Sequence, residues 1–197
     1  GKGLVSELNY LTNTYFSENL DKYYLKSIFF GGGTPSLIDF KVLQKIINKC
    51  IERFKFFSLS NDIEITLEAN PNSLTKSKLL NFRNAGINRI SIGAQSFDKK
   101  FLNFLGRDHS AYEARRNIEY AREVFNNVSF DLIYAMPNQT VYEWEKSLKT
   151  ALQFEPDHLS LYQLTIEEGT AFYQMFRKGM LTPINNDLAS EMYSITE

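Results

Sequence analysis

Cysteine is almost absent from this sequence, which has only Cys50 among its 197 residues. A single thiol cannot form an intrachain disulfide. This favours a reducing compartment, so we expect a cytoplasmic protein. Long apolar runs are missing too, because none reaches the roughly 18 residues that a transmembrane helix needs. The N-terminus also lacks the apolar stretch of a signal peptide. We therefore expect neither a transmembrane segment nor a secreted protein.

Neither sign of charge is in excess, because the chain has 22 basic and 23 acidic residues. A protein that binds nucleic-acid phosphates needs a basic stripe, so we expect no nucleic-acid partner. The two histidines, His109 and His158, have no partner at metal-ligand spacing. We expect His109 to be a solvated or capping neighbour of the helix cap at Ser110. We expect His158 to be half-exposed at the start of a strand.

Hydrophobic residues make up 43% of the chain, which is enough for a sizeable core. Their spacing alternates between the strand period and the helix period. Strands are expected at 27–30, 63–71, 89–97, 128–136 and 158–166, and helices at 4–15, 40–54, 75–86, 110–125 and 140–151, around Phe172 and around Met192. Capping boxes at Ser110–Glu113 and Thr140–Glu143, and a C′ glycine at Gly86, mark three helix ends. Strands that alternate with helices indicate βαβ units in a parallel sheet, which is either open and doubly wound or a full or partial barrel.

Polar residues or glycines occur toward the end of each predicted strand. They are Gly31 to Thr34 for the first strand, Glu68 and Asn70 for the second, Gln95 and Ser96 for the third, Asp131 for the fourth, and Gln163 and Thr165 for the fifth. In both candidate folds, ligands bind at the C-terminal ends of the strands. We therefore expect these residues to converge on one site.

The three glycines of FFGGGTPS favour a ligand. Without Cβ atoms the backbone can approach a ligand closely, and successive N–H groups can hold a carboxylate or a phosphate. The sequence does not match a nucleotide P-loop, because no G-K-[ST] follows. It does not match a dinucleotide fingerprint either, because Ser36 stands where the third spaced glycine belongs. A tight turn would explain one glycine, whereas three in a row favour a binding role.

Asp131 is a carboxylate inside an apolar strand, so it needs a cation, a hydroxyl-rich ligand or a hydrogen-bonded network. A buried charge left without its partner costs on the order of 3–5 kcal/mol. Arg107, in LGRDHS, is the partner that we expect within the protein. Two alternatives stay open: a purely structural pair between Asp131 and Arg107, or a pair that faces a ligand.

Six motifs carry a family resemblance. They are FFGGGTPS, ITLEANP, INRISIGAQSF, LGRDHS, FDLIYAMPNQT and HLSLYQLTIEEGT. Their order and spacing resemble the radical S-adenosylmethionine proteins related to oxygen-independent coproporphyrinogen III oxidase. LEANP, LGRDH and SLYQLTIE are most similar to the HemW branch, the haem-chaperone relatives. The resemblance implies an α/β fold, a partial (β/α)6 barrel with parallel strands.

The same resemblance implies a binding site for S-adenosylmethionine. It assigns Gly32, Gly33 and Thr34 to the methionine moiety and Glu68 to the nucleoside or amino end. It places Gln95, Arg107 and Asp131 around a nucleotide-type ligand, and Tyr162 and Thr165 beside an adenine. No catalytic residue and no metal ligand is assigned within this chain.

The sequence also departs from the family pattern. The C-x3-C-x2-C loop that holds the family's [4Fe–4S] cluster, and the first barrel strand before it, are missing, and Cys50 cannot replace three thiolates. Ala135 and Asn138 occupy positions that are usually glycine or small. We therefore expect a fragment in which 1–180 is an incomplete core barrel and 181–197 begins the connection to an absent C-terminal domain. On this interpretation, only the complete protein would hold the cluster, and the chain alone would be inactive.

Three functions are compatible with these motifs. The first is the core of a HemW-like protein of haem trafficking or porphyrin metabolism, with haem or porphyrin as a further ligand and haem-accepting proteins as partners. The second is an oxygen-independent coproporphyrinogen III dehydrogenase. The third is a truncated remnant without catalytic activity.

Overall fold

A computed structural model describes residues 2–16, 22–56 and 63–197 of the chain. Its centre is a five-stranded sheet whose strands lie in chain order. The strands are β2 (Ser27–Phe30), β4 (Glu64–Ala69), β5 (Arg89–Gln95), β6 (Asn127–Tyr134) and β7 (His158–Gln163). Every neighbouring pair is parallel, which confirms the predicted α/β class. Among the described strands, β2 forms one edge of this sheet and β7 the other.

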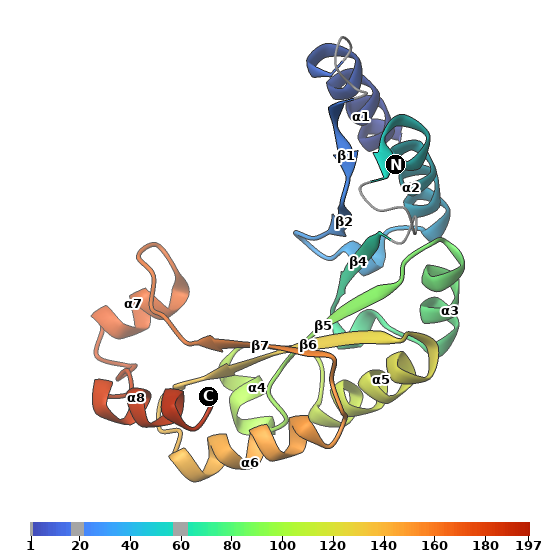
Figure 1. Cartoon of the computed structure of the whole chain (residues 1–197). Coiled ribbons are helices and arrows are strands. Elements are labelled where there is room, and N and C mark those ends of the chain that lie inside the picture. Colours follow the sequence, from blue (N-terminus) through green and yellow to red (C-terminus); the bar gives the residue numbers. More distant parts are fainter. Residues whose placement is uncertain (1, 17–21, 57–62) are drawn as a thin grey trace.

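Helices connect the strands, and α2, α3, α5 and α6 lie along the outer side of the curved sheet (Figure 1). The helices are α1 (Lys2–Tyr15), α2 (Phe40–Arg53), α3 (Lys76–Asn84), α4 (Lys99–Phe104), α5 (Ala111–Val124), α6 (Val141–Leu152), α7 (Ala171–Arg177) and α8 (Asn186–Ser194). Within the described ranges, none of them is long and apolar enough to span a membrane.

Several short elements were not predicted from the sequence. They are α4, the 3-10 turns η2 (Pro35–Leu37) and η3 (Pro71–Ser73), and the strands β1 (Tyr24–Leu25) and β3 (Lys55–Phe56), which pair in parallel. Each is shorter than the window of residues in which hydrophobic periodicity can be recognised.

The predicted helix ends are confirmed. Ser110 and Thr140 each accept a hydrogen bond from the backbone N–H three residues ahead, and the glutamate there reaches back in both cases, which completes two capping boxes. Thr75 caps α3 in the same manner without the glutamate. Gly86 follows α3, and its neighbour Ile87 donates to the Phe82 carbonyl, the bond that closes a helix C-terminus.

The hydrophobic core lies between the outer face of the sheet and the helices. On β6, Val128, Phe130 and Leu132 are fully buried. The ring of Phe130 packs edge to face against Phe97, at 5.9 Å between centroids, and against Phe154, at 6.1 Å. Apolar burial of this kind supplies most of the stabilisation of the fold.

The C-terminal helix α8 packs on the same core. Met192 is fully buried, and the Trp144 indole of α6 donates a hydrogen bond of 2.9 Å to the Thr196 hydroxyl. The domain boundary expected at residue 180 stays a prediction.

The inner face of the sheet is polar. Glu68 on β4 pairs in register with Ser91 on β5, and Ser91 pairs with Ser129 on β6. Asp131 pairs with Ser160 on β7. A parallel sheet covered by helices on both faces is apolar on both. The alternation of apolar and polar residues here places the candidate site residues Glu68 and Asp131 on the inner face.

Candidate functional site

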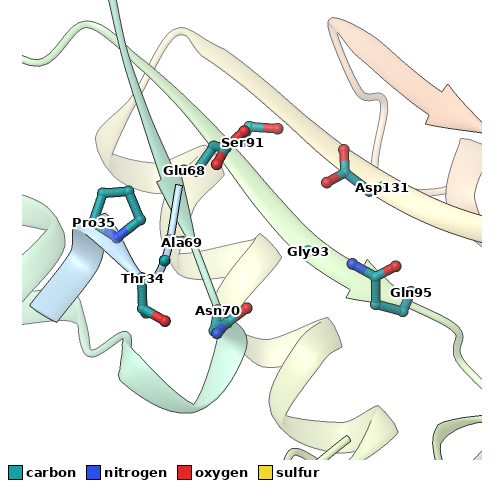
Figure 2. Close-up of a pocket in the computed structure, with 10 residues that line it drawn as sticks. Thr34, Pro35, Glu68, Ala69, Asn70, Ser91, Gly93, Gln95 and Asp131 are labelled. Carbon is teal, nitrogen blue, oxygen red and sulfur yellow. The ribbon is translucent and has the colours of Figure 1, made fainter. Parts of the chain in front are cut away.

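A pocket of about 150 Å³ lies on the inner face, toward the C-terminal ends of β4, β5 and β6 (Figure 2). The residues that line it are Gly33, Thr34, Pro35, Glu68, Ala69, Asn70, Ser91, Gly93, Gln95 and Asp131. Five of the nine residues predicted to bind a cofactor are in this lining, namely Gly33, Thr34, Glu68, Gln95 and Asp131. The structure therefore brings the majority of them together, although they come from four separate segments of the chain.

The glycine loop after β2 forms one wall of the pocket. Gly32 and Gly33 have φ values of 79° and 59°, in the left-handed region that favours glycine. The Gly32 N–H donates a hydrogen bond of 3.3 Å to Glu68 Oε2. The loop and the end of β4 are therefore joined at the pocket, as the sequence predicted for a glycine loop beside Glu68.

Buried hydroxyl groups also join the loop after β2 to the loop after β4. The Ser36 and Ser73 hydroxyls lie 2.5 Å apart, and Ser73 also donates to the Asn70 carbonyl at 2.7 Å. Asn117 of α5 donates to the Pro71 carbonyl at 2.7 Å. These bonds hold the loop after β4 in place, and Asn70 in that loop lines the pocket.

Asp131 and Glu68 place two carboxylates in one pocket. Burial raises the pKa of Asp131, and the negative charge of Glu68 raises it further. A hydrogen bond from the Ser160 hydroxyl and the positive charges of Arg89 and His158 act in the opposite direction. The ionised form of Asp131 is therefore held in this pocket at an energetic cost.

The predicted pair between Asp131 and Arg107 is wrong. Asp131 instead has the Ser160 hydroxyl as its hydrogen-bond partner, and the positive charge of Arg89, not that of Arg107, counteracts the rise in its pKa. Arg107 Nη2 lies 3.5 Å from Asn70 Oδ1, at the rim of the pocket. The physical reason is the strand register, which places Ser160 directly opposite Asp131.

Gly93 forms the floor on which three polar groups converge. A Cβ atom on Gly93 would lie 2.9 Å from Gln95 Nε2, 3.5 Å from Arg107 Nη2 and 3.7 Å from Asn70 Oδ1. Gln95, Arg107 and Asn70 thus meet over a position that has no side chain. Such a cradle is what a ligand with several polar groups requires.

The remaining predicted residues lie outside the pocket lining. Gly32 contributes its N–H to Glu68, and Arg107 reaches the rim. Tyr162 is on β7 with 55% of its surface exposed, and Thr165 lies beyond the end of that strand and is exposed. Their contact with an adenine stays a prediction.

Ser91 and Gly93 were missed as lining residues, although the sequence contains a signal for them. In RISIGAQ, small or polar residues alternate with Ile90, Ile92 and Ala94, which are fully buried. A strand with one large apolar face and one small polar face indicates a ligand on the second face.

The expectation that His109 is solvated is wrong. Only 4% of its surface is exposed, and its Nε2 lies 3.0 Å from the Ala94 carbonyl oxygen. Burial lowers the pKa of His109.

The residues of this chain do not fit an iron–sulfur cluster. Cys50 is the only cysteine in the sequence, and it is buried on α2, where burial raises the pKa of its thiol. No group of three or more His, Cys, Asp or Glu side chains in the described ranges is arranged to hold a metal ion. A [4Fe–4S] cluster normally needs three or four thiolates.

Comparison with known proteins defines the class of this chain. The model of the Radical SAM superfamily matches residues 15–151, so the chain belongs to that superfamily. Within it, the chain is 44% identical over 170 residues to "Radical S-adenosyl methionine domain-containing protein 1, mitochondrial" of Mus musculus, a match covering 86% of this chain and 38% of the relative. It is 38% identical over 173 residues to "Heme chaperone HemW" of Bacillus subtilis, covering 87% of this chain and 45% of the relative. These matches confirm the family resemblance that the motifs predicted.

A solved structure supports the fold. Coproporphyrinogen III oxidase (HemN) from Escherichia coli, described as a radical SAM enzyme, superimposes with a TM-score of 0.73 at 24% identity, over 91% of this chain and 42% of that chain. At this level of identity the likeness concerns the fold alone. The chain spans less than half the length of these relatives.

Proposed function

We propose that the pocket at the strand ends binds S-adenosylmethionine. The observation that carries the proposal is the joining of the glycine loop to Glu68 in a pocket that also contains Asp131, within a radical SAM chain. The ligand has a cationic ammonium and a cationic sulfonium, which suit a pocket with two carboxylates. Its own carboxylate and its adenine need N–H and amide groups, which the glycine loop, Asn70 and Gln95 supply.

The electrostatics of the pocket favour a cationic ligand. Burial raises the pKa of Asp131, and repulsion by the Glu68 carboxylate raises it further. A bound cation would relieve this repulsion and would lower the pKa of Asp131 again. In the family the [4Fe–4S] cluster supplies the electron that cleaves the cofactor. The residues of this chain do not fit that group, so binding, and not cleavage, is what we assign to them.

We further propose that the protein acts in haem trafficking or porphyrin metabolism, with haem or a porphyrin as a second ligand and haem-accepting proteins as partners. The support is the similarity to proteins named heme chaperone HemW, including the one from Escherichia coli, at 40% identity over 149 residues. A second candidate is coproporphyrinogen III dehydrogenation, which the motif resemblance to the oxidase relatives leaves open. A compartment that keeps thiols reduced suits the single buried cysteine, and the cytoplasm remains our proposal.

Calorimetric titration of the protein with S-adenosylmethionine tests the binding proposal. Glu68→Gln and Asp131→Asn should each weaken the affinity about tenfold or more, because each removes a charged interaction with the ligand. The matched control is Glu145→Gln, whose carboxylate pairs with Lys149 on the exposed side of α6 and should not matter for binding. The proposal fails if the unaltered protein does not bind the ligand, or if both site variants bind it as well as the control does.

A further inference from the structure

His109 is a buried histidine that does not line the pocket but bonds to the backbone of β5. It lies in the loop between α4 and α5, almost fully buried, with Nε2 3.0 Å from the Ala94 carbonyl oxygen. A carbonyl oxygen can only accept a hydrogen bond, so Nε2 of His109 is the donor. A buried histidine that donates to one particular carbonyl holds that carbonyl in place.

The residue after that carbonyl is Gln95, whose backbone is strained. Its φ is 64°, in the left-handed region where a residue with a side chain costs roughly 1–2 kcal/mol. The pairing of β5 with β6 also shifts here: Ile92 is opposite Phe130 and Gln95 is opposite Leu132, so β5 contains one extra residue. Bulges of this kind redirect a side chain beside a functional site. In this case the redirected side chain is Gln95, which lines the pocket (Figure 2).

The bulge leaves the Ala94 carbonyl outside the regular ladder, where it accepts from the Ser96 N–H at 2.7 Å and from His109. The two residues before His109 are fixed as well. Arg107 contacts Asn70 at 3.5 Å, and the Asp108 carboxylate accepts a bond of 2.6 Å from the Asn72 amide. Three consecutive residues of this loop therefore hold the ends of β4 and β5 in a fixed relation.

We infer that His109 is a positioning residue for ligand binding: its hydrogen bond to Ala94 keeps Gln95 in the left-handed conformation that directs its amide into the pocket. His109 does not line the pocket and acts through Gln95. The inference rests on the proposed binding of S-adenosylmethionine. It adds a determinant of affinity that lies behind the pocket wall.

Two substitutions separate the hydrogen bond from the volume of the side chain. His109→Gln keeps an N–H donor at a similar distance along the side chain, whereas His109→Leu fills the space without a donor. In titrations with S-adenosylmethionine, the leucine variant should lose about tenfold in affinity and the glutamine variant should retain most of it. Should the leucine variant not fold, His109→Asn replaces it, because its shorter amide cannot reach Ala94 and should lose affinity in the same manner.

A double-mutant cycle distinguishes positioning from a general structural role. Gln95→Ala alone should weaken binding, and adding His109→Leu should weaken it no further, because the group through which His109 acts is already gone. Equal losses with and without Gln95 would overturn the inference, as would wild-type affinity in the leucine variant.

A measurement without ligand tests the role of His109 even if the proposed function is wrong. If the unaltered protein does not bind S-adenosylmethionine, the proposed function fails. Hydrogen–deuterium exchange over residues 93–97 then decides the inference. Faster exchange in the leucine variant than in the glutamine variant supports it, and equal exchange overturns it.

Discussion

Gly93→Ala should separate the stability of the fold from the function of the pocket. Gly93 lies inside β5, and its φ is not among the left-handed values, so alanine fits the backbone. The added Cβ would lie 2.9 Å from Gln95 Nε2, which is tighter than real contacts allow. This atom is the end of a flexible side chain and can move away at little cost to the folded state. The change therefore displaces Gln95 and leaves the strand intact.

Gly93→Ala should change the stability of the fold and the affinity for the ligand in opposite directions. Replacing a strand glycine by alanine at a compatible position stabilises a protein by about 0.4–1 kcal/mol, mainly because the unfolded chain loses conformational freedom. Displacing the Gln95 amide removes a neutral hydrogen bond to the ligand, worth about 0.5–1.5 kcal/mol, and the new methyl group occupies part of the pocket. We therefore expect unchanged or slightly raised stability together with about a tenfold loss of affinity for S-adenosylmethionine.

Urea unfolding and calorimetric titration, measured on the same preparations, check this expectation. The control is Gly179→Ala, in the turn after α7, where a Cβ would meet no atom within 4 Å but φ is 68°. It should lose about 1 kcal/mol of stability and keep its affinity. If Gly93→Ala lowers stability by more than the control and leaves the affinity unchanged, Gly93 belongs to the packing of the sheet, and the convergence of polar groups over it has no role in binding.

Three further predictions concern the core and two of the groups whose pKa is shifted, Asp131 and His109. Phe130→Ala should lower the free energy of unfolding by about 3–5 kcal/mol in urea titrations, because the ring is fully buried between two other phenylalanines; a loss below about 1 kcal/mol would contradict this. Because the pKa of Asp131 is raised in the folded state, stability that is present at acid pH is lost as pH rises through the folded-state pKa. Asp131→Asn should therefore be more stable than the unaltered protein at pH 7, with no gain below about pH 3.5. The pKa of His109 is lowered instead, so its contribution to stability is fully present above about pH 6.5 and is lost as pH falls through the folded-state pKa. His109→Gln should therefore flatten that part of the stability–pH curve. If the stability of the unaltered protein and that of His109→Gln change equally with pH in this range, the last prediction is refuted.

The elements of the fold could be predicted because their signals are local. Ser110 and Glu113 form a capping box within four residues of sequence, and the alternation around Phe130 shows which side of β6 is buried. The glycine loop and Glu68 could be assigned to one site because parallel strands all end at the same edge. Elements such as α4, with its six residues, are too short to show a periodic pattern.

The contacts within the site could not be predicted, because they depend on register and on a bulge. The choice of Arg107 as the partner of Asp131 required knowing which residue of β7 lies opposite, and the sequence does not contain that information. The hydrogen bond from His109 to the Ala94 carbonyl lies at the extra residue in β5, which the sequence does not reveal. The φ values of Ala135 and Asn138 are 59° and 57°. Both residues therefore adopt the left-handed conformation that favours glycine, although neither is a glycine.

A crystal structure of the protein in complex with S-adenosylmethionine tests the central claim most directly. We predict that the ligand lies between the glycine loop and Asp131, with a cationic group of the ligand at Glu68 or Asp131 and with Gln95 in contact with it (Figure 2). A second pocket, between the end of β7 and α7 and α8, is lined by Tyr173, Phe176 and Ala189 among others. Electron density for the ligand in that pocket, with the space beside Asp131 empty, would contradict the account.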